Sequence, residues 1–520
     1  METFPWWTES QKKLAEEVEE FVEENAPRAA EALWTFENPE DIVKKVAKKG
    51  WFGTLIPEEY GGMGSEVGVT GACIVAEGLA RLGPLTATYS TTCFGGTHQL
   101  VRLGTPEQKE RWLPKIARGE QLNALCLTEP FVGSDAAGVT TRATRVEGGY
   151  VVNGKKRFIS TSGIADAYFV YVKTSDNPSD KAAYRHLTGL YVQKGMPGFT
   201  VERINALGVF DGVRNGVLNF NNVFVPEDNV VGGEGMGWMC MISGLNLERV
   251  LIAVSVVSGI REALRYSYYM SQRRVQFGRR TIEFESNQYR IADMIIGYKT
   301  SRLLTYYAAY LLDKGSEPLI EANSAKIYAT ETARKVAEDA LQVMGGDGFT
   351  KYYPVESLLR DAKILEVGGG TNDVLRRLIA NQGWNIMKDM LKPPRRRVSK
   401  KFGIPLPYFR NPPELELPTK CGASDPEAVE KSILLALAED YLVNPGLHMT
   451  REELMEDTGL DEERLDEALL SLEEKQLVDI YRDKKGVLRL IKATYAGLDK
   501  ARPIDYYRWY PEWVRKGEVF

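Results

Sequence analysis

The chain has 520 residues, of which 43% are apolar, and a formal net charge of −5 with a pI near 5.7. A chain of this length and composition can bury large cores and is expected to form two to four domains. Its negative balance excludes a global positive field that would attract nucleic acid or anionic lipid.

The five cysteines are scattered without Cys-x-x-Cys spacing, and there are only three histidines. This composition argues against a disulfide framework, a zinc site or an iron–sulfur cluster, so no metal is expected. The first residues lack the basic and apolar regions of a signal peptide, and no run of about 18 uncharged apolar residues occurs. We therefore expect a soluble, cytoplasmic protein with no membrane segment.

The hydrophobic pattern changes twice along the first three-quarters of the chain. Helical periodicity over residues 1–122, with a turn-rich interruption at 57–64, predicts an N-terminal α-helical domain. Short β-rich runs between Gly, Asn and Pro over 123–240 predict a middle β domain, a small antiparallel barrel or sandwich. Helical periodicity returns over 241–384 and predicts a bundle of long helices.

The last quarter of the chain begins with a change of composition. Residues 385–424 are rich in proline and arginine and predict a linker. A first helix is predicted over 425–441, a second opens at the capping box Thr450–Glu453, and a third is predicted over 461–475. With two short strands around Asp483–Gly486 they resemble a winged-helix module over 425–500. Residues 501–520 form an aromatic tail.

Phosphate-binding loops of the common kinds are excluded. Gly62-Met-Gly64 is followed by Val67 where a third glycine is needed, and Gly346-Asp-Gly348 is followed by Lys351. Neither opens a βαβ unit, and no Gly-Lys-Ser/Thr loop exists. A nucleotide would therefore not be bound on a Rossmann turn.

Seven separated strings occur in a fixed order before residue 384. They are Leu127–Asp135, Arg157–Ser160, Val223–Pro226, Arg274–Gly278, Ala292–Met294, Gln342–Gly346 and Arg360–Asp373. Together they resemble the acyl-CoA dehydrogenases. The resemblance implies an α+β fold with an N-terminal α domain, a middle β-barrel and a C-terminal four-helix bundle, here followed by the small winged-helix-like domain. It also implies FAD as the cofactor and an acyl-CoA thioester as the substrate.

The resemblance assigns the cofactor-binding residues. Thr128 and Ser160 are assigned to the flavin, Phe158 to packing against its ring, and Ser134 to the flavin or to acyl-CoA. For Thr128 and Ser134 the alternative is ordinary turn chemistry. A second group, expected at the adenine end of an FAD held by a neighbouring subunit, implies a homo-oligomer, a dimer or tetramer. This group comprises Arg274, Phe277, Gln342, Gly345 and Gly346, and Thr371 and Asp373 complete the cofactor set. For Arg274 the alternative is a solvated helix terminus.

The triple glycine Gly368–Gly370 departs from the family pattern, because Gly369 stands where most members carry the catalytic glutamate. The segment Ser243–Ala253 resembles isovaleryl-CoA dehydrogenase, whose base lies on a different helix, and it selects Glu248. Burial between apolar neighbours should raise the pKa of Glu248, while Arg249 keeps it ionisable. The alternative is a Glu-Arg pair on a solvated helix face.

The expected reaction is α,β-desaturation, with α-proton abstraction by Glu248 and hydride transfer to the flavin. The backbone N–H of Gly369 is expected to bind the thioester carbonyl, and Asn246 and Arg249 to lie near the pantetheine arm. Gly368 and Gly369 should leave room for a branched, cyclic or aryl acyl group. An electron-transferring flavoprotein or similar acceptor is the expected partner.

Two other functions fit parts of the sequence. One is a related flavoenzyme, an oxidase or a decarboxylating dehydrogenase, and the other is a non-catalytic flavin-binding scaffold. A DNA-binding role for the winged-helix-like domain is disfavoured, because its third predicted helix, 461–475, carries seven acidic against two basic residues.

Overall fold

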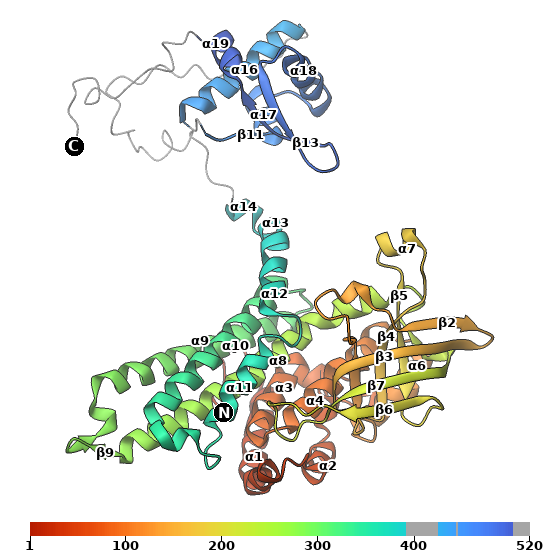
Figure 1. The fold of residues 1–520 in the computed structure, drawn as a ribbon, viewed down its shortest axis with the longest axis vertical. Helices are drawn as coiled ribbons and strands as arrows, with labels where there is room; N and C mark the ends of the chain where they lie inside the picture. Colours follow the sequence, from red (N-terminus) through yellow and green to blue (C-terminus); the bar gives the residue numbers. More distant parts are fainter. Residues whose placement is uncertain (392–424, 444–445, 503–520) are drawn as a thin grey trace. The chain divides into compact units, whose positions relative to one another are not determined.

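The computed structural model describes residues 1–391, 425–443 and 446–502, which belong to two compact units that divide after Lys388 (Figure 1). The predicted linker from residue 392 and the aromatic tail from residue 503 lie outside the described residues. The first residues of that predicted linker are helical, because two short helices, α13 (Trp384–Ile386) and α14 (Lys388–Leu391), continue beyond residue 384.

The N-terminal part of the first unit is helical, as predicted. Two of its helices begin at capping boxes: Thr8 N donates to Gln11 Oε1 over 3.0 Å while Gln11 N donates to Thr8 Oγ1, and Thr105 and Gln108 repeat the arrangement. The helices are α1 (Glu9–Thr35), α2 (Glu40–Lys48), α3 (Gly64–Leu79), α4 (Leu85–Thr92), α5 (His98–Leu103) and α6 (Pro106–Ala117).

The middle of the first unit is an eight-stranded sheet in the order β6-β7-β3-β2-β4-β5-β8, with β1 paired to β4. Strand β4 is buried on both faces. Tyr168 and Val170 pack inside the sheet's own core, whereas Phe169 and Tyr171 pack with Trp112 of α6. The strands are β1 (Asn123–Cys126), β2 (Arg142–Val146), β3 (Gly149–Ser160), β4 (Ala167–Lys173), β5 (Leu187–Gln193), β6 (Phe199–Ile204), β7 (Asn215–Pro226) and β8 (Val230–Val231), with a short helix α7 (Pro178–Ala182) before β5.

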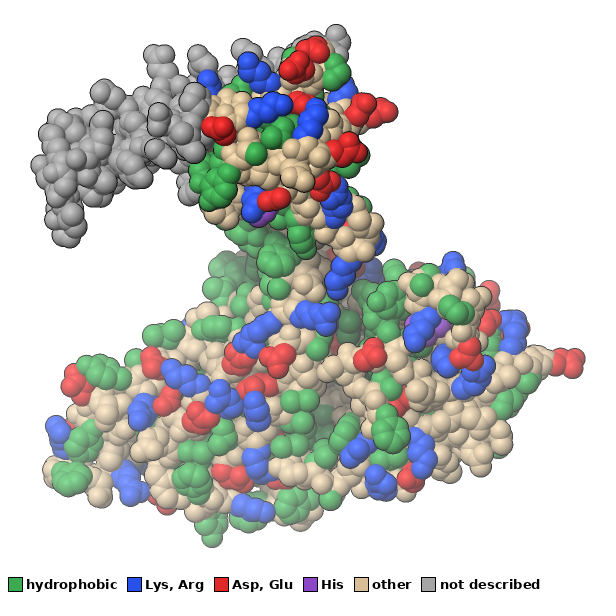
Figure 2. Space-filling model, turned by 45° about the horizontal axis from the view of Figure 1, so that its top comes forward, with side chains coloured by type: hydrophobic (Ala, Val, Ile, Leu, Met, Phe, Trp, Pro, Cys, Tyr) green, Lys and Arg blue, Asp and Glu red, His purple; other side chains and the backbone are tan. Residues whose placement is uncertain are grey.

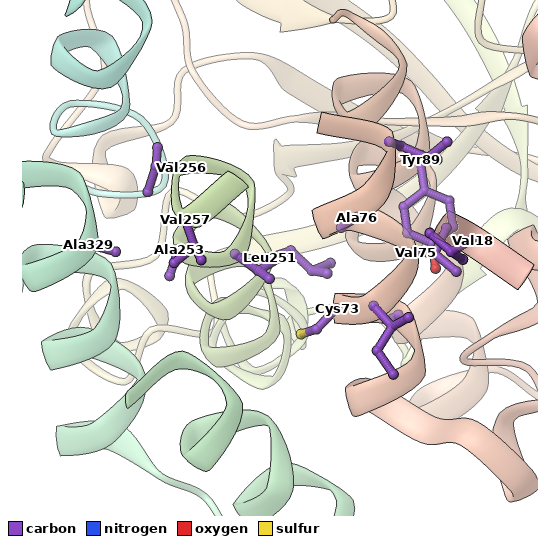
Figure 3. Packing of buried hydrophobic residues seen from close by; sticks show 14 of the residues in the cluster. Val18, Cys73, Val75, Ala76, Tyr89, Leu251, Ala253, Val256, Val257 and Ala329 are labelled. Carbon is purple, nitrogen blue, oxygen red and sulfur yellow. The ribbon is translucent and has the colours of Figure 1, made fainter. Parts of the chain in front are cut away.

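Long helices form the rest of the first unit, and α8 lies at its centre. Leu251 of α8 points toward Cys73 of α3, while Ala253 and Val257 lie on the side of Ala329 of α10 (Figure 3). By length and composition α8 could cross a membrane, but 67% of its most apolar stretch is buried in this packing. The helices are α8 (Gly237–Arg273), α9 (Glu285–Asp313), α10 (Leu319–Met344), α11 (Val355–Leu365) and α12 (Asn372–Leu378), with a small hairpin of β9 (Val275–Gln276) and β10 (Arg279–Arg280).

The described part of the second unit has the elements that the sequence predicts. The capping box at Thr450 and Glu453 is present, and Asp461 caps the following helix through Arg464 N. Three strands pair in the order β11-β13-β12. The identification as a winged-helix module stays a prediction. The elements are α16 (Pro426–Val443), β11 (Met449–Thr450), α17 (Arg451–Thr458), α18 (Glu462–Glu474), β12 (Val478–Arg482), β13 (Leu488–Ala493) and α19 (Tyr495–Ala501).

Candidate active site

A cavity of about 2350 Å³ lies in the first unit where the helices meet the sheet. Its wall is formed by α1, α4, β3, α8, α11 and the glycine turn at 368–370. Ligand pockets usually have volumes of roughly 300–1,000 Å³. This cavity is therefore large enough to hold two extended molecules together.

Glu248 projects from α8 into the wall of this cavity, where it is partly buried. Burial raises the pKa of its carboxyl group, and the positive charges of Arg249 and Lys326 act in the opposite direction. Within the described part of the chain, Glu248 makes no hydrogen bond or ion pair. Three other carboxylates along the wall are paired: Glu262 with Arg81, Glu317 with Arg102 and Glu356 with Arg360. Glu248 is thus an available base.

The glycine turn lies directly against Glu248. A Cβ atom added to Gly369 would be 3.5 Å from Glu248 Oε1 and only 2.5 Å from Cδ1 of Ile252, and the φ of Gly369 is +67°. No other residue type fits there without displacement. At Gly368 the nearest atom to an added Cβ is 3.8 Å away. The sequence suggested free space at both glycines, but Ile252 occupies the space at 369, so Gly368 alone leaves room.

Polar groups surround the same part of the cavity. The N–H of Gly369 donates no hydrogen bond to any part of the chain that the structure describes. Arg249 is buried, its Nε has no partner among the described residues, and burial lowers the pKa of its guanidinium to about 10. Asn246, one turn before, lines the cavity and lies 3.5 Å from Glu317 Oε2. A donor, a cation and a carboxylate therefore converge on one space.

The residues that the resemblance assigns to the flavin come from the sheet side of this cavity. Thr128, Ser134, Phe158 and Ser160 all line it. An irregularity in the β3–β7 pairing between Lys156 and Ile159 gives Phe158 a φ of +58° and leaves its ring 48% exposed. The Arg157 guanidinium lies 4.4 Å from the centre of that ring. Thr371, which caps α12, lines the cavity from the opposite side.

The other expected cofactor residues lie outside the cavity. Arg274 forms an ion pair of 2.9 Å with Asp347, next to Gly346, and the Phe277 ring is 94% exposed on the β9–β10 hairpin. The side chains of Gln342 and Asp373 are exposed. Gly345 lies two residues before Asp347, the partner of Arg274. None of these residues lines the cavity, so a ligand confined to the cavity of the same chain would not contact them.

Comparison with known proteins identifies the family. The family model for the acyl-CoA dehydrogenase N-terminal domain matches residues 8–120, that for the middle domain matches 124–223, and that for the C-terminal domain matches 235–384. The chain belongs to the acyl-CoA dehydrogenase family. Members of this family are FAD-dependent oxidoreductases, and the fold expected from the resemblance is confirmed.

Curated acyl-CoA dehydrogenases resemble the chain over most of their own length. The mitochondrial isovaleryl-CoA dehydrogenase of Solanum tuberosum is 36% identical over 379 residues, which are 72% of this chain and 90% of that protein. The cyclohex-1-ene-1-carbonyl-CoA dehydrogenase of Geobacter metallireducens is 37% identical over 373 residues, 71% and 96% of the two chains. The solved butyryl-CoA dehydrogenase of Megasphaera elsdenii matches with a TM-score of 0.70 at 30% identity, covering 73% of this chain and 99% of that one.

The cavity of this acyl-CoA dehydrogenase fits FAD. Thr128 and Ser160 offer hydroxyl groups at its wall, Phe158 offers an aromatic face held out by its left-handed backbone, and Gly133 leaves open space where a Cβ would stand. These groups suit the polar edge and the flat ring of a flavin.

A buried ion pair fixes the loop that carries Thr128. Lys156 is fully buried, and its Nζ donates to Leu127 O over 3.0 Å and to Glu129 Oε1 over 2.8 Å. Thr140 N and Thr141 N donate to the same carboxylate. Burial acts to raise the pKa of Glu129, but Lys156 and these donors hold it at about 2. The residues on either side of Glu129 are therefore held in one conformation.

Replacement of Lys156 by methionine should weaken FAD binding. The variant leaves Leu127 O without its donor and the buried Glu129 carboxylate without its cation. The unpaired carbonyl alone costs about 1–3 kcal/mol, which corresponds to roughly 10–100-fold in the dissociation constant of FAD. The ratio of flavin to protein absorbance gives the FAD content of the purified variant. A fluorescence titration of the apoprotein with FAD gives the dissociation constant. The neighbouring Lys155→Met removes only an exposed pair with Glu202 and serves as the control. Equal FAD affinity of the two variants would show that the ion pair does not shape the cofactor loop.

Two features of the site were not predicted. Asp361, in the Arg360–Asp373 string, is buried and accepts a hydrogen bond of 2.7 Å from Phe210 N, which fixes the loop before β7 at the cavity wall. Burial raises the pKa of Asp361 to about 6. Lys326 of α10 is fully buried behind the glycine turn. Lys326 shares a helical stripe with Ala322, Ala325 and Ala329, but a lysine in such a stripe does not by itself indicate burial.

Proposed function

We propose that this protein is an acyl-CoA dehydrogenase in which Glu248 is the catalytic base. The observation that carries the proposal is the contact between Glu248 and the glycine turn: an added Cβ at residue 369, where most family members carry the base, would lie 3.5 Å from Glu248 Oε1. The carboxylate reaches the same space from α8. The resemblance of Ser243–Ala253 to isovaleryl-CoA dehydrogenase supports the assignment.

The reaction forms a double bond between Cα and Cβ of the acyl group. The Cα–H bond breaks and its proton passes to the carboxylate of Glu248, while the Cβ–H bond breaks and its hydrogen leaves with both electrons as hydride. FAD, when bound, supplies the acceptor for that hydride. Glu248 must be ionised to accept the proton, so the rate should rise with pH through its raised pKa.

The glycine turn stabilises the charge that develops on the thioester oxygen. As the α-proton leaves, negative charge moves to this oxygen, and the free N–H of Gly369 is available to donate a hydrogen bond to it. Arg249 adds a buried positive charge beside Glu248, and with Asn246 it is proposed to bind the pantetheine arm. Both residues and Gly368 line the cavity.

Several residues are proposed to hold FAD. Thr128, Ser134, Ser160 and Thr371, which line the cavity, would hold the flavin, and Phe158 would offer its ring to the flavin ring. A second, exposed group is proposed to bind the adenine end of an FAD held by a second copy of the chain. It consists of Arg274, Phe277, Gln342, Gly345 and Gly346. Asp373, two residues after Thr371, is proposed to contact FAD as well. A homo-oligomer follows from this arrangement.

A branched or cyclic acyl-CoA is the proposed substrate. Gly368 leaves free space in the cavity wall beside the base, which a linear chain would leave unfilled. Two relatives above 35% identity are named for branched or cyclic acyl groups, isovaleryl-CoA and cyclohex-1-ene-1-carbonyl-CoA. The electron acceptor is proposed to be an electron-transferring flavoprotein, since one solved neighbour comes from a study of such a protein.

The proposed function is tested by anaerobic addition of acyl-CoAs to the purified FAD-loaded protein. We expect isovaleryl-CoA or a cyclic acyl-CoA to bleach the flavin absorbance at least about tenfold faster than butyryl-CoA, because filling one methylene-sized space contributes about 1–3 kcal/mol. Product analysis should find the α,β-unsaturated thioester. Preference for the linear substrate would refute the substrate proposal, and retained flavin without reduction by any acyl-CoA would refute the reaction.

Nucleic acid is not a proposed partner. Acidic and basic side chains are interspersed over the surface seen in Figure 2, without a continuous basic face. In the second unit, the first turn of α18 carries Glu462 and Glu463, whose charges repel phosphate.

A further inference from the structure

Lys326 is a lysine buried where the active-site turn meets α10. Its side chain is fully inaccessible to solvent. Nζ donates to the carbonyl oxygen of Gly370 over 3.0 Å and to Asn372 Oδ1 over 2.9 Å. It does not line the cavity in which substrate and cofactor are proposed to bind.

The bonds of Lys326 belong to a network that continues along α10. Asn372 Nδ2 donates to Thr330 Oγ1 and to Glu331 Oε1, each over 3.1 Å. Asn372 N donates to Glu366 O over 2.9 Å, which closes the turn from its other end. The same lysine therefore binds one glycine of the turn and Asn372, the first residue of α12.

Burial of a lysine requires a reason. An isolated ammonium group is strongly disfavoured away from water unless it is paired and hydrogen-bonded. The two atoms that accept its hydrogen bonds, Gly370 O and Asn372 Oδ1, are neutral. Among charged groups, Glu248 acts on Lys326 most strongly, since burial lowers the pKa of Lys326 to about 8 and Glu248 is the first group that opposes this. The Glu248 carboxylate of the active site thus favours the protonated form of Lys326.

We propose that Lys326 is a positioning residue of the active site, which holds the Gly368–Gly370 turn through Gly370 O and, when protonated, supplies a positive charge behind Glu248. This inference rests on the proposed role of Glu248 as the base. The two effects act together, because the turn carries the Gly369 N–H that faces the substrate while the charge favours the ionised form of the carboxylate.

Other charged groups also act on Glu248 and Lys326. Arg249, beside Glu248 on α8, lowers the pKa of both Glu248 and Lys326. Glu366 and Glu331, from the turn and from α10, act on Lys326 and raise its pKa. Tyr171 of β4, a buried phenol with a raised pKa, interacts with Glu248. Lys326 and Arg249 are the cations that act on Glu248, and Lys326 is the one that also binds the turn.

The test compares three replacements of Lys326 in the full-length, FAD-loaded protein. Lys326→Met removes the charge and both hydrogen bonds, Lys326→Gln keeps a donor without charge, and Lys326→Arg keeps the charge. The rate of flavin reduction by the best acyl-CoA is measured from pH 5.5 to about 9, a span chosen to cross the ordinary range of shifted carboxyl groups. Lys335→Met is the control, since Lys335 is an exposed lysine of the same helix, 3.6 Å from Asp293.

We expect Lys326→Met to reduce the flavin about 10–100-fold more slowly at pH 7, the loss typical of a misplaced reacting group. The loss should grow as the pH falls, because Glu248 without the neighbouring charge binds its proton up to a higher pH. In Lys326→Gln the rise of the rate with pH should be displaced to the same higher pH, with a smaller loss of rate at high pH. In Lys326→Arg the rise should return to the pH at which it occurs in the wild type. Hydrogen–deuterium exchange of the peptide over 366–374 should be faster in Lys326→Met than in Lys335→Met.

The outcomes separate this inference from the proposed function. If Glu248→Gln abolishes reduction while all Lys326 variants keep the wild-type pH profile, the role of Lys326 is wrong and the base assignment stands. If Glu248→Gln still reduces flavin normally, the proposed function itself fails. If Lys326→Met loses FAD or does not fold, Lys326→Gln and Lys326→Arg decide, and identical pH profiles for these two variants overturn the inference.

Discussion

Glu248→Gln should slow the reduction of flavin by acyl-CoA by about 10²–10⁴-fold, the usual contribution of a general base. Glutamine keeps the shape of the side chain, and the carboxylate makes no hydrogen bond within the described residues, so FAD should remain bound. Stopped-flow absorbance under anaerobic conditions measures the rate. Glu338→Gln, which removes an exposed carboxylate of α10 paired with Arg334, is the matched control.

The same variant should be at least as stable as the wild type at neutral pH. Burial raises the pKa of Glu248 above its unfolded value, so the folded protein favours the protonated form. The stability that this group contributes is therefore complete at low pH and is lost as the pH rises through its folded pKa. Thermal unfolding at pH 5 and pH 8 checks the sign. A lower midpoint for Glu248→Gln at pH 8 would show that the carboxylate is stabilised by contacts of its own.

Arg302→Met should destabilise the first unit by about 3–5 kcal/mol, because it leaves a buried carboxylate without its partner. Arg302 of α9 is 2% exposed and forms an ion pair of 2.9 Å with Glu77 of α3, to which Tyr306 also donates over 2.6 Å. Its guanidinium lies 4.9 Å from the ring centre of Phe4 and 5.6 Å from that of Trp7. Urea unfolding followed by near-ultraviolet circular dichroism measures the loss.

A double variant distinguishes the two causes of that loss. When both partners of a buried ion pair are replaced by apolar residues, stability is often recovered. Glu77→Leu combined with Arg302→Met should therefore be more stable than Arg302→Met alone. Equal stability of the double and the single variant would assign the loss to the aromatic contacts of Arg302 rather than to the unpaired charge of Glu77.

Much of the fold was predictable because its signals are local. The capping pairs Thr105–Gln108 and Thr450–Glu453 satisfy the free N–H groups at a helix start by sequence alone. The stripe of Val250, Val254 and Val257 on α8 is buried as the helical period requires. The family model for the C-terminal domain also ends at residue 384. The short helices α13 and α14 continue beyond that residue, because no proline interrupts the chain before Pro393.

Packing inside the site could not be read from the sequence. Nothing local indicates that Ile252 fills the space beside Gly369, because the two positions are more than a hundred residues apart and meet only when α8 packs on the turn. Lys326 was passed over for a similar reason. A lysine in a helix is ordinarily solvated, and its burial depends on carbonyl and amide groups that other segments supply.

The sequence by itself determined the family and the order of the three family domains. It also showed that residue 369 is glycine where most members carry glutamate, and it offered Glu248 as a candidate base. These follow from ordered motifs that a single chain displays. The tertiary structure decided that Glu248 faces the turn, that Gly368 rather than Gly369 leaves free space, and that Lys326 is buried and bound to the carbonyl of Gly370. Distances, burial and electrostatic neighbours arise from residues far apart in the chain, so they exist only once the helices and the sheet have packed.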